Sequence, residues 1–247
     1  MPSLYECKAW ARNLLARAGW QKRRKADRLV GLLKRFDVAL VFDVGANAGQ
    51  FGRHLRSMGY EGRLVSFEPL SEAFHRLQAN AFGIPQWQPV QLAIGDYDGE
   101  ATIHVAGNSQ SSSLLQMLPR HVAAAPKSAY VGVEAITVRR LDTICNQFRQ
   151  ADEPFFIKLD VQGFEHAVLC GAQQAIQQCV GIQLEMAMTP LYEGEVLFFQ
   201  MLAEMQERGF ALMSLPGGFT DTRTGELLQV DGLFVRRELL ESRLLAA

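Results

Sequence analysis

The chain has 247 residues, of which 48% are hydrophobic and 21% charged, and its formal net charge is -1. This length fits one large α/β domain with an appended element, and the composition is that of an ordinary globular protein. A charge this close to zero excludes any general electrostatic argument for nucleic acid or for an acidic partner.

Residues 1–36 are expected to form a basic helical extension. Apolar residues recur at helical spacing through 4–35, with a break near Gly19, and the basic cluster 22–25 lies between the two expected helices. Residues 1–40 contain ten Lys or Arg and three acids, a net charge of +7, so the remainder carries -8. The extension is either a capping element with a solvated basic face or a surface for anionic lipid, an anionic substrate or a partner.

From residue 38 onward, short apolar strands alternate with amphipathic helices, which is typical of a parallel sheet. We predict strands at 38–44, 63–67, 89–94, 101–105, 134–138, 155–159, 180–185, 210–214 and 232–235. Helices are predicted at 50–58, 71–81, 141–149, 164–178 and 195–208, with a long loop at 107–133. The last two strands are joined without a helix, which predicts an antiparallel final strand on a mostly parallel sheet.

A glycine-rich turn after the first strand is the strongest local signal. It reads Phe42-Asp43-Val44-Gly45-Ala46-Asn47-Ala48-Gly49-Gln50-Phe51. Glycine suits a backbone that approaches a ligand or adopts positive φ, and Asn47 tolerates that region best among other residues. Asp43 can bind a cationic amino group such as that of a methionine moiety. Glu68, at the end of the second strand, can accept both hydroxyls of a ribose.

This turn favours S-adenosylmethionine over NAD as the bound nucleoside. The NAD fingerprint Gly-x-Gly-x-x-Gly is not reproduced, because Asn47 replaces the glycine that lets a pyrophosphate approach the backbone. S-adenosylmethionine has no phosphate, so a side chain can stand there. Two alternatives stay open: a non-catalytic nucleoside-binding or scaffold protein of the same fold, and an NAD-dependent oxidoreductase.

The motifs together resemble the FkbM-type S-adenosylmethionine-dependent methyltransferases. The resemblance is carried by residues 42–49, 66–69, 93–96 with Gly99, 111–114, 157–165 and 168–172, in order across roughly 40–235. The family usually has an acid where this chain has Gln162, and residues 1–36 are not covered. The resemblance implies a class I methyltransferase (Rossmann-like) fold with a doubly wound seven-stranded sheet. It also implies S-adenosylmethionine as methyl donor and O-methylation of a small molecule, sugar or glycan.

The residues expected to bind the cofactor lie at the ends of strands or in the polar loop that follows them. They are Asp43, Gly45, Ala46, Asn47, Gly49, Gln50, Phe51, Glu68, Pro69, Ala93, Ile94, Asp96, Ser112, Ser113 and Asp160. In open α/β sheets the ligand lies beyond these carboxyl ends.

Methyl transfer requires that the acceptor oxygen be aligned and relieved of its proton. Asp160 is expected to be the general base, and Lys158, which alternates with it along the strand, to stabilise an alkoxide or keep Asp160 ionised. Glu185 would be a second catalytic carboxylate. Asp160 and Glu185 are also a conceivable Mg²⁺ site, which is not predicted because no third ligand can be identified. The alternatives are a structural ion pair for Lys158 and Asp160, and a helix-dipole role for Glu165.

The other titratable side chains give no ligand pattern. His54, His75, His104, His121 and His166 are scattered, and the four cysteines contain no CxxC, so we expect structural or exposed roles. Without a signal-peptide run or about 18 uninterrupted apolar residues, a cytoplasmic location is expected. The expected partner is a small-molecule or glycan acceptor and no nucleic acid, with peripheral membrane or anionic-substrate contact through the basic extension. The oligomeric state stays open.

Overall fold

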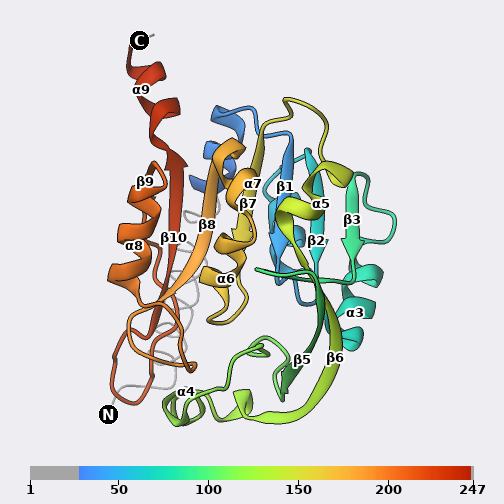
Figure 1. Ribbon diagram of the computed structural model, residues 1–247, viewed down its shortest axis with the longest axis vertical. Coiled ribbons are helices and arrows are strands. Elements are labelled where there is room, and N and C mark those ends of the chain that lie inside the picture. The colour runs from blue at the N-terminus through green and yellow to red at the C-terminus, as the bar shows by residue number, and fades with distance from the viewer. Residues whose placement is uncertain (1–27, 246–247) are drawn as a thin grey trace, which may run out of the picture.

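The computed structural model describes residues 28–245, with the side chains of 28–242, and its centre is a seven-stranded sheet (Figure 1). Its strands are β1 (Leu40–Val44), β2 (Arg63–Phe67), β3 (Trp87–Val90), β7 (Phe155–Leu159), β8 (Gly181–Ala187), β9 (Phe210–Ser214) and β10 (Gln229–Arg236). Their order is β3-β2-β1-β7-β8-β10-β9. β10 runs antiparallel to both of its neighbours, β8 and β9, and the other pairs are parallel, so β10 alone is opposite in direction to the other six strands. The predicted doubly wound sheet with an antiparallel last strand is therefore confirmed.

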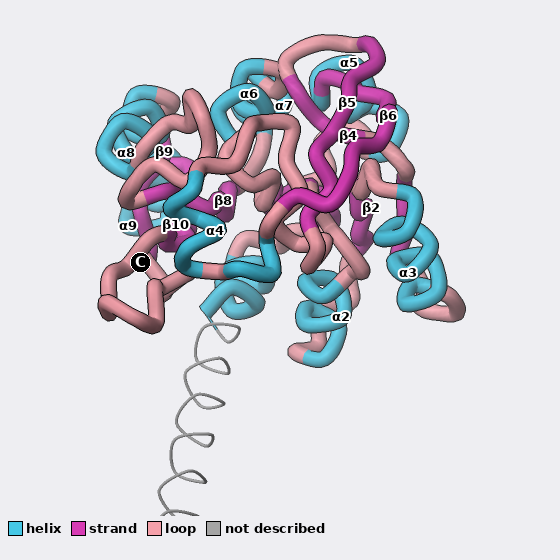
Figure 2. The backbone as a smooth tube through the Cα atoms, turned by 90° about the horizontal axis from the view of Figure 1, so that it is seen from below, coloured by secondary structure: helices cyan, strands magenta, loops and turns pink. Residues whose placement is uncertain are grey.

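Helices cover both faces of this sheet (Figures 1 and 2). On one face lie α2 (Gln50–Ser57), α3 (Ser71–Ala81) and a helix over residues 28–35. On the other lie α5 (Leu141–Phe148), α6 (Glu165–Cys170), α7 (Gln173–Gln178) and α8 (Phe198–Glu207). In β1, Val41 packs against the helices of the first face and Phe42 against those of the second. Alternate side chains of this strand therefore belong to two separate hydrophobic cores.

Several predicted elements have other bounds in the structure. The predicted helix 164–178 is wrong as a single helix, because the chain breaks it into α6 and α7 at Gly171 and Ala172. At this point Gly171 passes so close to the Gly95 carbonyl that a Cβ would lie 1.8 Å from its oxygen. The terminal helix α9 (Arg237–Leu245) follows β10 directly and was not predicted. Its apolar residues form no clear stripe at helical spacing, so the sequence offered no periodic signal for this helix.

The predicted strand 89–94 is also wrong as one strand. After β3, the chain enters a second, three-stranded sheet of order β4-β6-β5, made of β4 (Ala93–Gly95), β5 (Gly99–Ala106) and β6 (Tyr130–Arg140). The predicted loop 107–133 is too long, because it contains α4 (Pro119–Ala124), the 3-10 turn η1 (Pro126–Ser128) and the start of β6. Successive exposed residues at 131–133 leave no alternation to signal that strand.

The predicted first helix and the basic cluster 22–25 fall within residues 1–27, outside the described residues. The helix over 28–35 packs into the α2–α3 layer and buries Leu29, Val30, Leu32 and Leu33. No helix within residues 28–245 has both the length and the apolar content to cross a bilayer.

Two glycine substitutions are expected to change stability in opposite directions. Gly171→Ala places a Cβ against the backbone oxygen of Gly95, so it should lower the free energy of unfolding by about 1–3 kcal/mol. Gly31→Ala, in the exposed face of the first described helix, meets no atom within 4 Å and should raise it by about 0.5–1 kcal/mol. Urea unfolding measures both, and a Gly171→Ala variant as stable as the unmodified protein would contradict the packing seen at Gly171.

Candidate active site

A cavity of about 490 Å³ opens beyond the carboxyl ends of β1, β2, β7 and β8, a volume suited to a small molecule. Most predicted site residues line it: Gly45, Ala46, Asn47, Gln50, Phe51, Glu68, Pro69, Ala93, Ile94, Ser112, Ser113, Lys158, Asp160 and Glu185. Three do not. Asp43 is fully buried beneath the cavity, Gly49 packs against Leu77 and Trp87, and Asp96 is exposed after β4.

The turn after β1 has the backbone that its sequence predicts. Gly45, Asn47 and Gly49 all have positive φ, at 76°, 46° and 81°. Gly45 also passes so close to the end of β7 that a Cβ would lie 1.9 Å from the Asp160 backbone oxygen. Only glycine satisfies both conditions, so this turn brings the ends of β1 and β7 together.

Glu68 fastens the turn to the end of β2. Its carboxylate accepts hydrogen bonds from the backbone N–H of Asn47 at 2.8 Å and of Leu70 at 2.9 Å. Burial raises the pKa of Glu68 to about 7. The carboxylate lines the cavity and keeps acceptor positions for a ligand, because each of its oxygens has two lone pairs.

The segment after β5 lies over the same turn. The Asn47 amide donates to the Ser109 hydroxyl at 3.2 Å, and Ser113 donates to the backbone oxygen of Gln162 at 2.7 Å. The Ser112 hydroxyl accepts the Ala106 N–H at 2.9 Å. Residues 107–118 are thus tied to both strand ends, and the serine hydroxyls predicted to contact the cofactor also hold their own segment in place.

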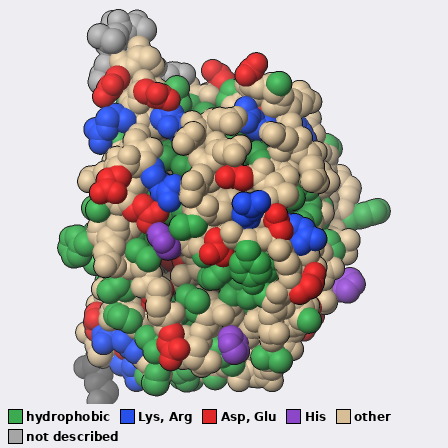
Figure 3. Space-filling view, viewed as in Figure 1, with side chains coloured by type: hydrophobic (Ala, Val, Ile, Leu, Met, Phe, Trp, Pro, Cys, Tyr) green, Lys and Arg blue, Asp and Glu red, His purple; other side chains and the backbone are tan. Residues whose placement is uncertain are grey.

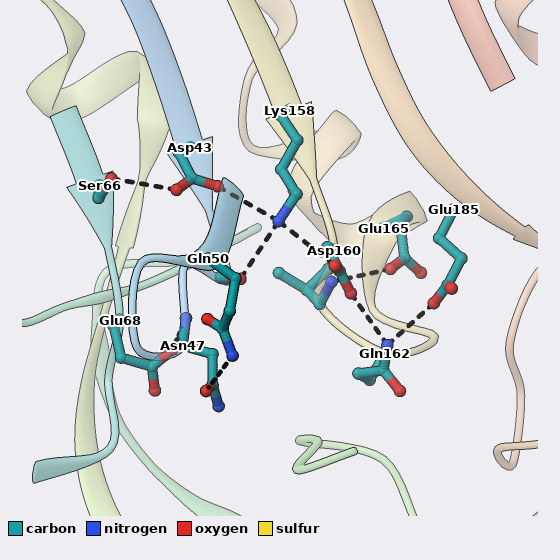
Figure 4. A network of polar contacts seen from close by, with 12 residues as sticks. Asp43, Asn47, Gln50, Ser66, Glu68, Lys158, Asp160, Gln162, Glu165 and Glu185 are labelled. Carbon is teal, nitrogen blue, oxygen red and sulfur yellow. Dashed lines mark hydrogen bonds and ion pairs between the residues drawn. The ribbon is translucent and has the colours of Figure 1, made fainter. Parts of the chain in front are cut away.

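An ion-pair row runs across the sheet under the cavity (Figure 4). The parallel register places Ser66 beside Asp43 and Asp43 beside Lys158. The Asp43 carboxylate accepts from the Ser66 hydroxyl at 3.0 Å and lies 3.2 Å from the Lys158 ammonium. The cation that Asp43 meets is therefore Lys158 of its own chain, not the ligand amino group expected from the sequence.

Lys158 joins three oxygen atoms. Its ammonium lies 3.2 Å from Asp43, 3.3 Å from Asp160 and 3.3 Å from the backbone oxygen of Gly45. Burial alone would lower the pKa of Lys158, but Asp160 and Asp43 outweigh burial and raise that pKa above its ordinary value. The ammonium donates a hydrogen bond to the Gly45 oxygen, and the ion pairs with Asp43 and Asp160 keep the charge on Lys158 at neutral pH.

Gln162 holds the two carboxylates of the cavity. Its amide nitrogen donates to Asp160 and to Glu185, both at 2.9 Å (Figure 4). Its amide oxygen lies 2.9 Å from the Tyr192 hydroxyl. Glu185 also accepts from the Gln229 amide at 2.9 Å, and burial raises the pKa of Glu185 well above its ordinary value. Asp160, by contrast, keeps 44% of its side chain exposed.

The arrangement does not suit the conceivable Mg²⁺ site. The nitrogen between Asp160 and Glu185 is a hydrogen-bond donor, whereas Mg²⁺ requires oxygen ligands. Within the described part of the chain, no three His, Cys, Asp or Glu side chains are grouped to hold a metal ion.

Sequence reasoning missed several polar residues of this cavity. Gln183 of β8 lines it beside the predicted Glu185, together with Gln229 and Asp231 of β10, and His121 of α4 lines it as well. The first four alternate with buried apolar residues in their strands, and this period-two polar pattern was the available signal. His121 and Tyr192 carry no comparable local signal.

Gln162→Glu is expected to lower both stability and activity. The substitution removes the shared donor and adds a third carboxylate beside Asp160 and Glu185. We expect the free energy of unfolding to fall by about 2–3 kcal/mol near neutral pH. The neighbouring acids hold the pKa of the introduced carboxyl above its value in the unfolded chain. The loss of stability should therefore shrink as pH falls, because the protonated carboxyl is uncharged and can again donate a hydrogen bond. Urea unfolding at several pH values measures this loss.

Gln173→Glu is the matched control. Gln173 is exposed in the first turn of α7, so this substitution should leave the stability unchanged. A pH-independent loss would contradict the role of Gln162.

Comparison with known proteins identifies relatives of this chain. A family model described as the methyltransferase FkbM domain matches residues 43–212. Among curated proteins, the 2-O-methyltransferase NoeI of Sinorhizobium fredii (strain NBRC 101917 / NGR234) is 25% identical over 174 residues, which cover 68% of this chain and 71% of that protein.

Two solved structures are similar at low sequence identity. Methyltransferase FkbM from Methylobacillus flagellatus KT has a TM-score of 0.48 and 16% identity, with 80% of this chain and 44% of that chain covered. This chain thus spans less than half of that protein. Magnesium protoporphyrin IX methyltransferase (ChlM) from Synechocystis PCC 6803, solved with bound SAM, has a TM-score of 0.47 and 13% identity, with 90% and 81% covered.

Proposed function

This chain belongs to the FkbM methyltransferase family, and we propose that it uses S-adenosylmethionine to methylate a hydroxyl oxygen of a small molecule, sugar or glycan. The observation that carries this proposal is the convergence of three strand ends on one cavity. The positive-φ turn after β1, Glu68 after β2 and Asp160 after β7 all line it. The 2-O-methyltransferase name of the curated relative supports oxygen as the target.

The half of the cavity around the β1 turn, which we call the cofactor half, suits a nucleoside. It comprises the turn 45–50, Glu68, and the apolar wall of Ala93 and Ile94. Glu68 can accept the ribose hydroxyls, and the open backbone of the turn leaves room close to Asp160. S-adenosylmethionine, when bound, supplies a methyl group on a positively charged sulfur.

Asp160 separates this half from the rest of the cavity. In Figure 4, Glu68, Asn47 and Gln50 lie on one side of it, and Gln162 and Glu185 lie on the other. We call the second side, with Gln183, Gln229, Asp231, His121 and Phe219, the acceptor half. Asp160, half-exposed at this boundary and oriented by Lys158 and Gln162, is the proposed base that takes the hydroxyl proton.

A small acceptor also agrees with the surface. On the face drawn in Figure 3, acidic and basic side chains of the described residues are interspersed rather than gathered by sign. Nucleic acid is usually bound by a continuous basic surface. Contact of the basic extension with an anionic or membrane-linked acceptor belongs to the same proposal and rests on the sequence of residues 1–36.

The experiment is incubation of the protein with methyl-labelled S-adenosylmethionine and an extract of its native host, followed by mass identification of what gains the label. Isothermal titration with S-adenosylmethionine accompanies it. Label in an ether-linked methyl group supports the proposal. Cofactor binding without label in any fraction would favour the non-catalytic binding protein, and a fluorescence change with NADH would favour the oxidoreductase.

A further inference from the structure

The acceptor half is lined by amides and carboxylic acids. Gln183 and Glu185 extend from alternate positions of β8, and the antiparallel register places Asp231 of β10 directly beside Glu185. The amides of Gln162 and Gln229 both donate to Glu185. Groups of this kind recognise hydroxyls, because a hydroxyl both donates to a carboxylate or amide oxygen and accepts from an amide nitrogen.

Charge restricts what can enter. Among the described residues that line the whole cavity, the only Lys or Arg is Lys158, and its ammonium is committed to Asp43, Asp160 and Gly45. Glu68, Asp160, Glu185 and Asp231 line the same cavity. A phosphate or carboxylate placed there would face these acids and no uncommitted Lys or Arg of the described residues, so an uncharged ligand is favoured.

His121 is a buried polar residue of this half with a ring nitrogen that lacks a partner among the described residues. Its side chain is buried, with 3% of the residue exposed, and it lines the cavity from α4. Its ring stands edge-on to Tyr192, with centroids 5.1 Å apart, and lies 5.6 Å from the ring of Phe219. The ring nitrogen Nδ1 is fully buried and has no hydrogen-bond partner among the described residues. Burial lowers the pKa of His121 to about 4, so the ring is neutral at pH 7.

A buried imidazole without a partner is destabilising unless something else completes it. Since His121 borders the cavity, a bound molecule can supply that partner, and Phe219 offers it an adjacent apolar ring face. A hydroxylated ring suits both His121 and Phe219, because its C–H face can contact the aromatic ring while a hydroxyl on its edge can hydrogen-bond the imidazole.

We propose that the acceptor half binds an uncharged, polyhydroxylated ring and that His121 hydrogen-bonds one of its hydroxyls. This rests on the proposed function, which places the acceptor on this side of Asp160. Any phosphate of a nucleotide-linked or lipid-linked acceptor then lies outside the cavity.

The first test measures binding without turnover. The protein, labelled with ¹³C at its histidine rings and saturated with S-adenosylhomocysteine, is titrated by NMR with methyl glucopyranoside, methyl galactopyranoside, methyl mannopyranoside and myo-inositol. At least one of them should move the His121 signal in a saturable manner. The matching hexose 6-phosphate should bind about tenfold more weakly or worse. A His121 signal that none of the four moves, or tighter binding of the phosphate, would overturn the proposal.

The second test uses His121→Phe, which keeps the ring packing and removes the unpaired Nδ1. The melting temperature should rise by about 2–4 °C, because a buried group without a partner is lost. Affinity for the polyol that bound should fall about threefold to tenfold, whereas that for S-adenosylhomocysteine should stay within about twofold. Retained polyol affinity, or a lower melting temperature, would overturn the assignment.

His166→Gln is the matched control. His166 is paired with Glu204 and lies outside the cavity, so polyol affinity should not change. The two proposals can fail separately. A protein that binds polyols at His121 but neither S-adenosylmethionine nor its demethylated product would contradict the proposed function and leave the subsite standing. Methyl transfer without any effect of polyols on the His121 signal would contradict the subsite and leave the proposed function standing.

Discussion

Asp160→Asn is expected to lower the rate of methyl transfer by about 10²–10⁴-fold, the range for loss of a general base. The substitution removes a carboxylate that borders both halves of the cavity and keeps nearly half of its side chain exposed. Affinity for S-adenosylmethionine should be largely kept, because Glu68 and the turn after β1 are unchanged. Single-turnover kinetics and isothermal titration measure the two effects separately.

Asp152→Asn is the matched control for this variant. Asp152 is exposed, lies just before the amino end of β7, at the opposite end of the strand from Asp160, and has a φ of 57° that asparagine also tolerates. Its turnover should equal that of the unmodified protein. If Asp160→Asn kept full turnover, Asp160 would be removed from the role of base.

Lys158→Met is expected to destabilise the protein by about 3–5 kcal/mol, the cost of leaving one partner of a buried ion pair uncompensated. The side chain of Asp43 is fully buried, and its only cationic partner is Lys158 among the residues that the structure describes. Asp160 loses the same partner but can turn to water, because its side chain is partly exposed. Thermal and urea unfolding give the loss directly.

The double variant Asp43→Asn, Lys158→Met isolates this pair. It removes both charges and keeps an acceptor for the Ser66 hydroxyl, so most of the lost stability should return, to within about 1–2 kcal/mol of the unmodified protein. A double variant no more stable than Lys158→Met would show that the loss comes from other contacts of the lysine side chain, whose ammonium lies 5.4 Å from the centre of the Phe51 ring, and not from the charge of Asp43.

Prediction from sequence succeeded where neighbouring residues decide the structure. The bounds of β2, α3, β7 and β9 agree with the predicted ranges because each has a clear period and a clear end. Between residues 89 and 140 it found strands within β5 and β6 but missed the break between β3 and β4, the first residues of β6, and α4. There the chain changes sheets within a few residues, and α4 is too short to show a helical period.

The same division holds in the site. The turn Gly45–Gly49 was predictable, since φ near +76° at Gly45 is a local property for which glycine is the natural residue. The position of Gln162 between two carboxylates was not, because Glu185 comes from another strand, 23 residues later in the chain. A residue type alone does not show which distant side chain it will meet.

The sequence by itself thus determined the order of strands and helices, the glycine turn and the acids at the strand ends, because local backbone conformation and burial period depend on adjacent residues. The tertiary structure alone decided what those acids contact. The register of β1 on β7 places Asp43 beside Lys158, and the fold of residues 107–128 places His121 at the cavity. Strand register and the closure of a long segment are set by the packing of the whole domain, which no short stretch of the chain contains.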